Sequence, residues 1–420
     1  MRLRILIVLL FVCFSSVYMS EAVEAKYDAV TARRADDFFN SIGVNTHFGY
    51  GDTNYRLYEE RLKPRLLELG VKHIREDGRF GWRPDVIAKF REVGAHGIKM
   101  LVIARAEGVR KLVEDLGDML WGLEGENEPD ISRSAYPTWP EYARKQQQKL
   151  YDTIKSAYSW LPVVGVSLAN CRDSPARLGD ISDLMDYGSI HPYAAGQPPM
   201  NHWGWGMSMN TALEKARIAN GDKPLIATEC GYHNRIGNKG HPGVSEKAAA
   251  IYHVCLPFVY FNQGIVRSYK YEFLDLRPDP DNEEMEYNFG LIRWDGTPKP
   301  SFYALKNLLA IVKDSDDPED FSPGSLSFAI EAPERVYSTL LQKSDGSFWL
   351  ALFRNITVYD TEKLKDIEVE PIEVSLRLRK KAREIEVYVP NNSDQPSMEF
   401  RNSRRLSLPL GKELVILKID

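Results

Sequence analysis

Short apolar runs alternate with longer amphipathic segments over most of the chain, from about Ser41 to Val312. Gly or Pro bounds the short runs, and the longer segments repeat their apolar residues with a helical period. This alternation is typical of strand–helix units around a parallel sheet. It predicts eight strands, at Ile42–Thr46, Val71–Arg75, Ile98–Ile103, Met119–Leu123, Val163–Leu168, Tyr187–Ile190, Leu225–Thr228 and Ile265–Tyr269.

Eight such units match the length of a closed (β/α)8 barrel, or TIM barrel, which typically takes about 250 residues. A doubly wound open sheet is a poorer match, because no Gly-x-Gly-x-x-Gly turn follows the first predicted strand. We therefore predict an α/β fold with a (β/α)8 TIM barrel over residues 26–313.

The pattern changes after the predicted barrel. Turn-forming residues accumulate between Asp314 and Gly324, and only short alternating segments follow, with Asp345-Gly346 as a hairpin turn. These segments predict a small C-terminal β-sandwich domain over residues 324–420, which we expect to brace the barrel. Its predicted strands are Ser347–Phe353, Ile372–Leu378, Glu384–Val389 and Glu413–Ile419.

The N-terminus has the pattern of a signal peptide. Arg2 and Arg4 precede an apolar run from Ile5 to about Phe14, and a polar stretch then ends at Ala25. We expect cleavage near Ala25, which removes residues 1–25, and a secreted or periplasmic protein. No later apolar stretch is long enough to predict a membrane span.

Composition narrows the range of partners. The formal net charge of −5 gives no positive field that would attract nucleic acid or an anionic membrane. Cys171, Cys230 and Cys255 contain no Cys-x-x-Cys pair, which excludes a disulfide scaffold or a zinc ribbon. The basic cluster between Arg377 and Arg383 is interpreted as a solvated strand face. The oligomeric state is left open.

Polar residues end several predicted strands, where the strand–helix loops of a barrel form its active-site face. Strand four is followed by Asn127-Glu128-Pro129, strand six by His191-Pro192-Tyr193, strand seven by Glu229, and strand two ends at Arg75. Glu128 and Glu229 are three units apart, and so lie on nearly opposite walls of the barrel mouth. Two carboxyl groups that flank one bond are what glycoside hydrolysis requires.

These motifs resemble those of the clan A glycoside hydrolases, retaining enzymes on (β/α)8 barrels that include cellulases, mannanases, β-xylosidases and β-glucuronidases. Asn127-Glu128 matches the clan's strand-four pattern, Glu229 its strand-seven nucleophile, His191-Pro192-Tyr193 its strand-six His-x-Tyr, and Arg75 the Arg that ends strand two. The resemblance covers Ile42 to Val312. A barrel followed by a sandwich looks more like the β-xylosidase and iduronidase branch than like simple cellulases.

The resemblance implies a carbohydrate substrate and a double displacement without cofactor or metal. Glu128 would be the general acid/base and Glu229 the nucleophile, with their carboxyl groups about 5 to 5.5 Å apart. By analogy, Asn127 would bond the sugar 2-hydroxyl and Arg75 would keep Glu229 ionised. His191 or Tyr193 would orient the nucleophile.

Aromatic residues in loops of the same face are further candidates, because sugar rings pack their C–H faces on aromatic planes. Many clan members place a Trp at the end of strand eight, where this chain has Tyr269, Tyr271 and Glu272. The loop aromatics are Tyr50, Phe80, Trp82, Trp203, Trp205 and Tyr232. The predicted substrate-binding set is Asn127, Arg75, His191, Tyr193, His47, Trp203, Trp205 and Tyr269.

Three alternatives stay open at this point. Glu124 and Glu126 share the alternation of Glu128 and compete with it for the acid role, although neither follows an Asn. A non-catalytic sugar-binding barrel would keep the fold without the chemistry. A metal-dependent isomerase or endonuclease would bind a divalent ion through Glu128, His191, Glu229 and either His233 or His47. The sequence does not distinguish the glycone, or endo from exo action.

Overall fold

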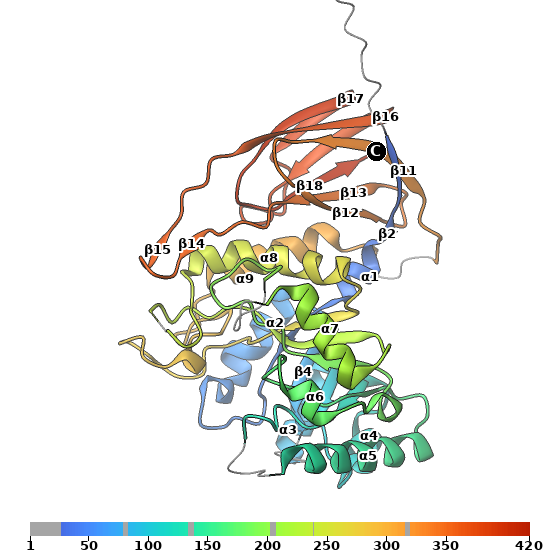
Figure 1. The fold of residues 1–420 in the computed structure, drawn as a ribbon, viewed down its shortest axis with the longest axis vertical. Coiled ribbons are helices and arrows are strands. Elements are labelled where there is room, and N and C mark those ends of the chain that lie inside the picture. Colours follow the sequence, from blue (N-terminus) through green and yellow to red (C-terminus); the bar gives the residue numbers. More distant parts are fainter. Residues whose placement is uncertain (1–26, 79–82, 133–137, 202–206, 238, 316–319) are drawn as a thin grey trace, which may run out of the picture.

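The computed structural model describes residues 27–78, 83–132, 138–201, 207–237, 239–315 and 320–420. Figure 1 shows a helix-wrapped body and a sheet-only body stacked along the long axis of the molecule. Helices α8 (Glu246–Asn262) and α9 (Pro300–Val312) lie between them. Of the helices in these ranges, none is both long and apolar enough to cross a membrane.

Eight parallel strands form the first body. Their hydrogen-bonded order is β7-β6-β5-β4-β3-β10-β9-β8, and a parallel bridge between Val164 and Tyr187 closes the ring. The predicted (β/α)8 barrel is therefore confirmed. The strands are β3 (Ile42–Asn45), β4 (His73–Asp77), β5 (Lys99–Ile103), β6 (Leu120–Glu124), β7 (Val163–Val164), β8 (Gly188–Ile190), β9 (Leu225–Cys230) and β10 (Arg267–Lys270).

Each barrel strand overlaps the range predicted for it and is followed by a helix. Helix α8 is buried on all sides from Ala248 to Phe261, because it packs on the barrel with one face and on the second body with the other. The remaining helices of the units are α2 (Lys63–Leu69), α3 (Pro84–Ala95), α4 (Val109–Leu116), α5 (Trp139–Ala157), α6 (Ser174–Leu178) and α7 (Met209–Asn220).

The second body, here called the β domain, is a mostly antiparallel sheet of eight strands, as predicted for the C-terminal part. Its order is β1-β11-β16-β18-β13-β12-β2, and β17 pairs with the other edge of β16. Its C-terminal strands are β11 (Ser325–Glu331), β12 (Tyr337–Gln342), β13 (Phe348–Phe353), β16 (Ile372–Tyr388), β17 (Met398–Leu410) and β18 (Val415–Ile419).

Strand β16 folds this sheet over on itself. Its first part pairs with β11 and its last part with β18, and the register shifts between Arg377 and Ala382. A bulge of this kind bends the strand that carries it. The predicted strands Ile372–Leu378 and Glu384–Val389 are thus two arms of one bent strand, which enclose an apolar core that includes Leu352.

The N-terminal residues belong to the β domain and not to the barrel. Strand β1 (Asp28–Thr31) pairs with β11, and β2 (Arg33–Arg34) pairs with β12. The sequence analysis placed everything from residue 26 onward in the barrel, because two strands this short show no clear alternation of their own. Helix α1 (Ala35–Asn40) then leads the chain into β3.

Candidate active site

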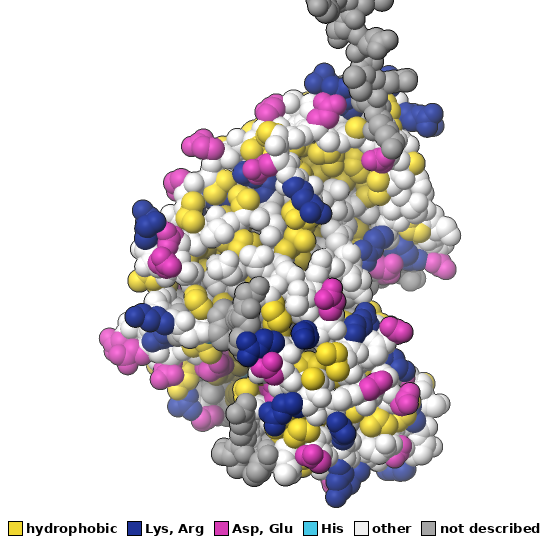
Figure 2. Space-filling model, in the orientation of Figure 1, with side chains coloured by type: hydrophobic (Ala, Val, Ile, Leu, Met, Phe, Trp, Pro, Cys, Tyr) yellow, Lys and Arg dark blue, Asp and Glu magenta, His cyan; other side chains and the backbone are white. Residues whose placement is uncertain are grey.

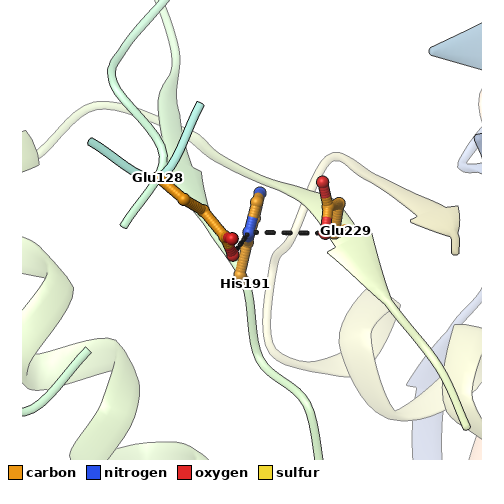
Figure 3. A group of neighbouring side chains, drawn as sticks. All are labelled: Glu128, His191 and Glu229. Carbon is orange, nitrogen blue, oxygen red and sulfur yellow. Dashed lines mark hydrogen bonds and ion pairs between the residues drawn. The ribbon is translucent and has the colours of Figure 1, made fainter. Parts of the chain in front are cut away.

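Two glutamates meet at the C-terminal end of the barrel strands. Glu229 is the fifth residue of β9, and Glu128 follows β6 by four residues. Glu128 has a left-handed backbone (φ 47°), and its N–H donates to the carbonyl of Ser167 at 3.0 Å. Figure 3 shows that both side chains point toward the imidazole of His191, which lies between them.

The separation of the two carboxyl groups is short. One carboxylate oxygen of each glutamate and a ring nitrogen of His191 all lie within 4.8 Å of one another. Retaining pairs are about 5–5.5 Å apart, whereas inverting pairs stand about 6.5–9.5 Å apart to leave room for a water molecule. The separation in this structure is closer to that of a retaining enzyme than to that of an inverting one.

Arg75, at the third position of β4, fixes the base of the site. All five N–H groups of its guanidinium are matched by acceptors. Nε and Nη2 donate to Glu124 at 2.5 and 2.9 Å, Nη1 donates to Glu229 at 2.8 Å and to Asn45 at 3.0 Å, and Nη2 also donates to Asn127 at 2.6 Å. Arg75 therefore holds the side chains of β3, β6 and β9 in one network.

The environment of Glu229 favours its ionised form. Burial on its own would favour the neutral form. The charges of His191 and Arg75, and the hydrogen bonds from Arg75 and from the hydroxyl of Tyr193 at 2.9 Å, outweigh burial and hold the pKa of Glu229 below its ordinary value. An ionised carboxylate is the form that can act as a nucleophile.

The environment of Glu128 favours its protonated form. Burial raises the pKa of Glu128 above its ordinary value against the hydrogen bond and charge of His191, and the charge of Glu229 adds to the rise. Two carboxyl groups whose pKa values are driven apart can divide the acid and nucleophile roles between them.

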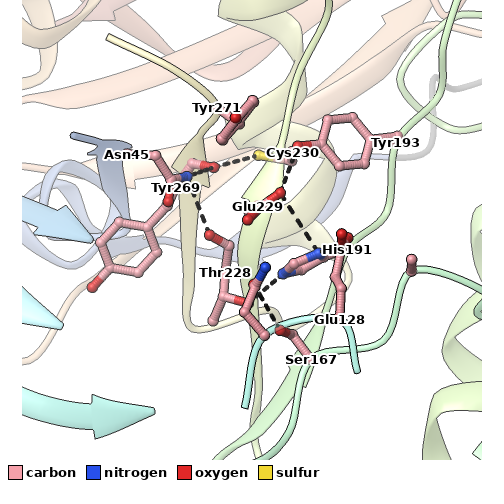
Figure 4. Close-up of polar contacts among 12 residues, drawn as sticks. Asn45, Glu128, Ser167, His191, Tyr193, Thr228, Glu229, Cys230, Tyr269 and Tyr271 are labelled. Carbon is pink, nitrogen blue, oxygen red and sulfur yellow. Dashed lines mark hydrogen bonds and ion pairs between the residues drawn. The ribbon is translucent and has the colours of Figure 1, made fainter. Parts of the chain in front are cut away.

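His191 is held at both ring nitrogens. Nδ1 lies 2.6 Å from Glu128 Oε1, and Nε2 lies 3.0 Å from the hydroxyl of Thr228, which in turn bonds Ser189 at 2.6 Å. Figure 4 shows His191 between Glu128 and Thr228. The pKa of His191 is raised, because the charge of Glu229 and the bond to Glu128 outweigh burial, which lowers it.

A cavity of about 510 Å³ opens above the two glutamates. A recess of about 80 Å³ adjoins it and shares the side chains of Asn127, Glu229 and Tyr271. The cavity is lined by Asn127, Glu128, Ile131, Ala169, Asn170, His191, Tyr193, Glu229, His241, Tyr271, Met285, Glu286 and Phe289. The last four of these come from the connection between β10 and α9, residues 271–299, of which the sequence analysis considered only Tyr271 and Glu272.

Most of the predicted site residues in the described ranges come together here. Asn127, His191 and Tyr193 line the cavity, while Arg75 lies beneath it and also borders the recess. His47 lines the recess only, where it lies 3.2 Å from a carboxylate oxygen of Glu272 and stacks on Tyr50 at 4.4 Å.

Tyr269 is a correction to the prediction. Its side chain is fully buried in the barrel interior with Leu101, Val164 and Ile226, and in Figure 4 it points away from the glutamates. Alternation places Tyr269 and Tyr271 on the same face of β10, but Tyr269 lies one layer deeper, so Tyr271 is the aromatic that lines the cavity.

The other predicted aromatics do not add to the cavity wall as it is described. Tyr232 is buried and stacks on Tyr252 with ring centroids 4.9 Å apart. Tyr50 borders only the recess. Phe80, Trp82, Trp203 and Trp205 lie outside the described residues.

The two rival acids have other partners. Glu124 is fully buried and receives two hydrogen bonds from Arg75. Glu126 pairs with Arg105 at 2.6 Å and accepts from the hydroxyl of Tyr142 at 3.1 Å. Neither side chain lines the cavity, so Glu128 is the acid candidate that the geometry supports.

Glu128, His191 and Glu229 are close enough for one ligand atom of each to hold a metal ion. The fourth ligands expected for a metal site are engaged elsewhere. Nε2 of His233 contacts the carbonyl of His241 at 2.8 Å, and His47 pairs with Glu272. Arg75, 2.8 Å from Glu229, also places a positive charge where a cation would bind.

The sequence matches no protein-family model and none of the curated proteins with which it was compared. Solved structures are similar to it. A family 39 glycoside hydrolase from the gut symbiont Bacteroides cellulosilyticus WH2 gives a TM-score of 0.63 at 16% identity, covering 91% of this chain and 82% of that one.

Two further structures cover 93% of this chain and 97% of their own. A monomeric beta-xylosidase from Caulobacter crescentus CB15 has a TM-score of 0.62 at 14% identity, and a glucosidase from Croceicoccus marinus has 0.60 at 10%. Identities this low establish the fold alone. The chain shares the fold of these glycoside hydrolases, and the strand-end motifs had predicted the likeness for the barrel.

Proposed function

We propose that this chain is an exported glycoside hydrolase that cleaves an O-glycosidic bond with retention of configuration. Its substrate is an oligosaccharide, a polysaccharide or a glycoconjugate. One observation carries the proposal: Glu128 and Glu229 place carboxylate oxygens within 4.8 Å of each other, with pKa values shifted in opposite directions. The cavity of about 510 Å³ above them has the size of a small-ligand site.

In the first step, Glu229 attacks the anomeric carbon and forms a bond to it. The bond from that carbon to the leaving oxygen breaks, and the leaving oxygen takes the proton of Glu128. The product is a glycosyl ester of Glu229. Esterification removes the negative charge of Glu229, so the pKa of Glu128 falls.

In the second step, the ionised Glu128 accepts a proton from a water molecule, whose oxygen attacks the anomeric carbon. The ester bond to Glu229 breaks, and the sugar leaves with its original configuration. Two inversions at one carbon account for the retention.

Asn127 is positioned to bind the hydroxyl next to the anomeric carbon. Its side-chain oxygen already accepts hydrogen bonds from Arg75 at 2.6 Å and from Ser167 at 3.1 Å. The amide NH2 group of this cavity-lining side chain is left to donate to a substrate.

Export is part of the proposal and rests on the sequence of residues 1–25, with its basic start and apolar run. Expression of the full chain, followed by N-terminal sequencing of the protein outside the cytoplasm, tests it. A mature terminus near Lys26 supports export, and an intact Met1 on protein found only inside the cell contradicts it.

Product configuration tests the chemistry. Aryl β-glycosides of a panel of sugars are incubated with the enzyme, and the anomer released first is identified by proton NMR before mutarotation. The proposal expects the β-anomer. An α-anomer from the same substrates would show inversion, and activity that disappears with a chelator and returns with a divalent ion would favour the metal-dependent alternative.

A further inference from the structure

Among the described residues, the Asp, Glu, Lys and Arg side chains that line the cavity are all acidic, and the recess adds one Arg. Figure 2 shows acidic and basic side chains mixed over the visible outer surface. In contrast, Glu128, Glu229 and Glu286 line the cavity, and Glu76 and Asp77 line the recess beside it. Among the described lining residues, Arg75 is the one Lys or Arg.

Arg75 has no donor left for a substrate. Each of its five N–H groups already has an acceptor, and two of these acceptors are the carboxylates of Glu124 and Glu229. A sugar carboxylate is usually recognised by an Arg or Lys that forms charge-assisted hydrogen bonds. The described wall of this cavity offers no such group.

The raised pKa of His191 favours a cationic ring, but that charge lies beside Glu128 and Glu229, which raise the pKa. His191 uses both ring nitrogens on Glu128 and Thr228. His241 lies against Phe289, with its Nδ1 3.2 Å from the sulfur of Met285.

Glu286 is the third carboxylate that lines the cavity, and it comes from the connection between β10 and α9. Its carboxylate accepts a hydrogen bond from the hydroxyl of Tyr271 at 3.2 Å. The ring of Tyr271 packs edge-on against Phe289, which also contacts Tyr193. The side chain of Glu286 is exposed to solvent in the open cavity, but desolvation by the surrounding wall, followed by the charges of Glu272 and Glu229, still raises its pKa to about 7. Both forms of the carboxyl group can bond a sugar hydroxyl.

We propose that the glycone is an uncharged sugar and that Glu286 is a specificity-determining residue, which binds hydroxyl groups of that sugar and disfavours uronic acids. This inference rests on the proposed glycoside hydrolase function. It follows from the chemistry of the wall: hydroxyl groups both donate to and accept from carboxyl groups, whereas a sugar carboxylate would meet Glu229 and Glu286 without a paired cation.

The test compares two substrates that differ only at C6. The wild-type enzyme is assayed with 4-nitrophenyl β-glucoside and 4-nitrophenyl β-glucuronide, and the matched xyloside, galactoside, mannoside and galacturonide extend the set. We expect the kcat/KM of each uronide to be about 10- to 100-fold or more below that of its neutral counterpart, the effect of one uncompensated like charge at close range.

At a pH above about 7, where Glu286 is ionised, Glu286→Gln removes one negative charge and keeps the size of the side chain. The uronide-to-neutral ratio of kcat/KM should rise about tenfold, because part of the repulsion is lost. The ratio is measured within one preparation, so partial misfolding does not change it. Glu283→Gln is the matched control, because it makes the same charge change in the same connection at an exposed position outside the cavity lining.

The outcomes separate the inference from the function on which it rests. If the enzyme hydrolyses neither the neutral glycosides nor the uronides, the proposed function is overturned. Uronides cleaved as well as the neutral glycosides, or better, would overturn the inference and leave the proposed function standing. Equal ratios for wild type, Glu286→Gln and Glu283→Gln would remove Glu286 from the determination of specificity.

Discussion

Two hollows of similar volume lie on either side of the connection between β10 and α9. Met285, Glu286 and Phe289 line the candidate active-site cavity of about 510 Å³, whereas Tyr287 and Asn288 line a second hollow of about 560 Å³. By volume alone, the second hollow would be as good a candidate for a binding site as the first. The state of their charged groups distinguishes them.

In the second hollow, the central charges are paired. Lys299 is almost fully buried and donates to Asp275 at 2.9 Å, to the side chain of Asn234 at 3.0 Å and to the carbonyl of Asn288 at 3.3 Å. Asp275 also accepts from the N–H of Gly290 at 2.8 Å. Such a pair fixes the connection in place and leaves little for a ligand to bind.

In the candidate active-site cavity, the two glutamates differ in the protonation state that their surroundings favour. Glu128 and Glu229 share His191, and their pKa values are shifted in opposite directions. Groups perturbed in this way mark a functional site more reliably than a hollow does. The comparison teaches that a buried ion pair between wall residues, such as Lys299 and Asp275, predicts a structural role. Two carboxyl groups with pKa values shifted in opposite directions, such as Glu128 and Glu229, predict a catalytic role.

Removal of the nucleophile should have the largest effect. Glu229→Ala should lower kcat on aryl glycosides on the order of 10⁴- to 10⁶-fold, as the loss of other covalent nucleophiles does. Azide should then restore turnover by entering the vacated space, and NMR should identify an inverted glycosyl azide. A variant that keeps most of its activity would show that the cavity does not use Glu229.

Glu128→Ala should be milder and should depend on the leaving group. Substrates with poor leaving groups should lose about 10²- to 10⁴-fold in rate, because general acid catalysis is gone. Activated leaving groups should be spared in the first step, and azide should give the retained product. The same azide configuration from the Glu128 and Glu229 variants would refute the division of roles.

Lys299→Met tests the second hollow. Removing one partner of a buried ion pair should lower the free energy of unfolding by about 3–5 kcal/mol, measured by urea denaturation. The kcat/KM per folded enzyme should not change. Lys299→Met combined with Asp275→Asn should recover part of the stability, since the unpaired charge is gone. A loss of activity without a loss of stability would give this hollow a catalytic role.

The smallest expected effect is a shift in the pH profile. Activity should be lost as pH falls through the lowered pKa of Glu229 and also as pH rises through the raised pKa of Glu128. Tyr193→Phe removes one hydrogen bond to Glu229, so the acid limb of kcat/KM should move up by about one pH unit. An unchanged acid limb with a displaced alkaline limb would reverse the assignment.

The barrel and its strand-end residues were accessible from sequence because both rest on periodicity. Alternating runs located eight strands, and the rule that barrel chemistry gathers at strand ends selected Asn127, Glu128, His191 and Glu229. Periodicity does not predict where a side chain points once the chain has left a helix or strand. Glu128 has a left-handed backbone, whereas Glu124 and Glu126 do not, and this difference became visible only in three dimensions.

The irregular connection between β10 and α9 was the part that sequence analysis missed. Met285, Glu286 and Phe289 obey no repeat, and which residues face the cavity depends on how 29 consecutive residues, 271–299, fold back over the barrel. The choice of Tyr269 failed for a related reason. Alternation assigns a side chain to a face but not to a depth within the barrel.

The sheet that receives both ends of the chain sets an order of assembly. The side-chain oxygens of Thr31 and Ser325 lie 3.1 Å apart across β1 and β11, yet 294 positions separate these residues. Ribosomal synthesis delivers β1 and β2 first and their partners β11 and β12 only after the whole barrel. Contacts between residues this distant along a chain form slowly compared with local strand–helix units. The earliest strands to be made are therefore among the last to be paired.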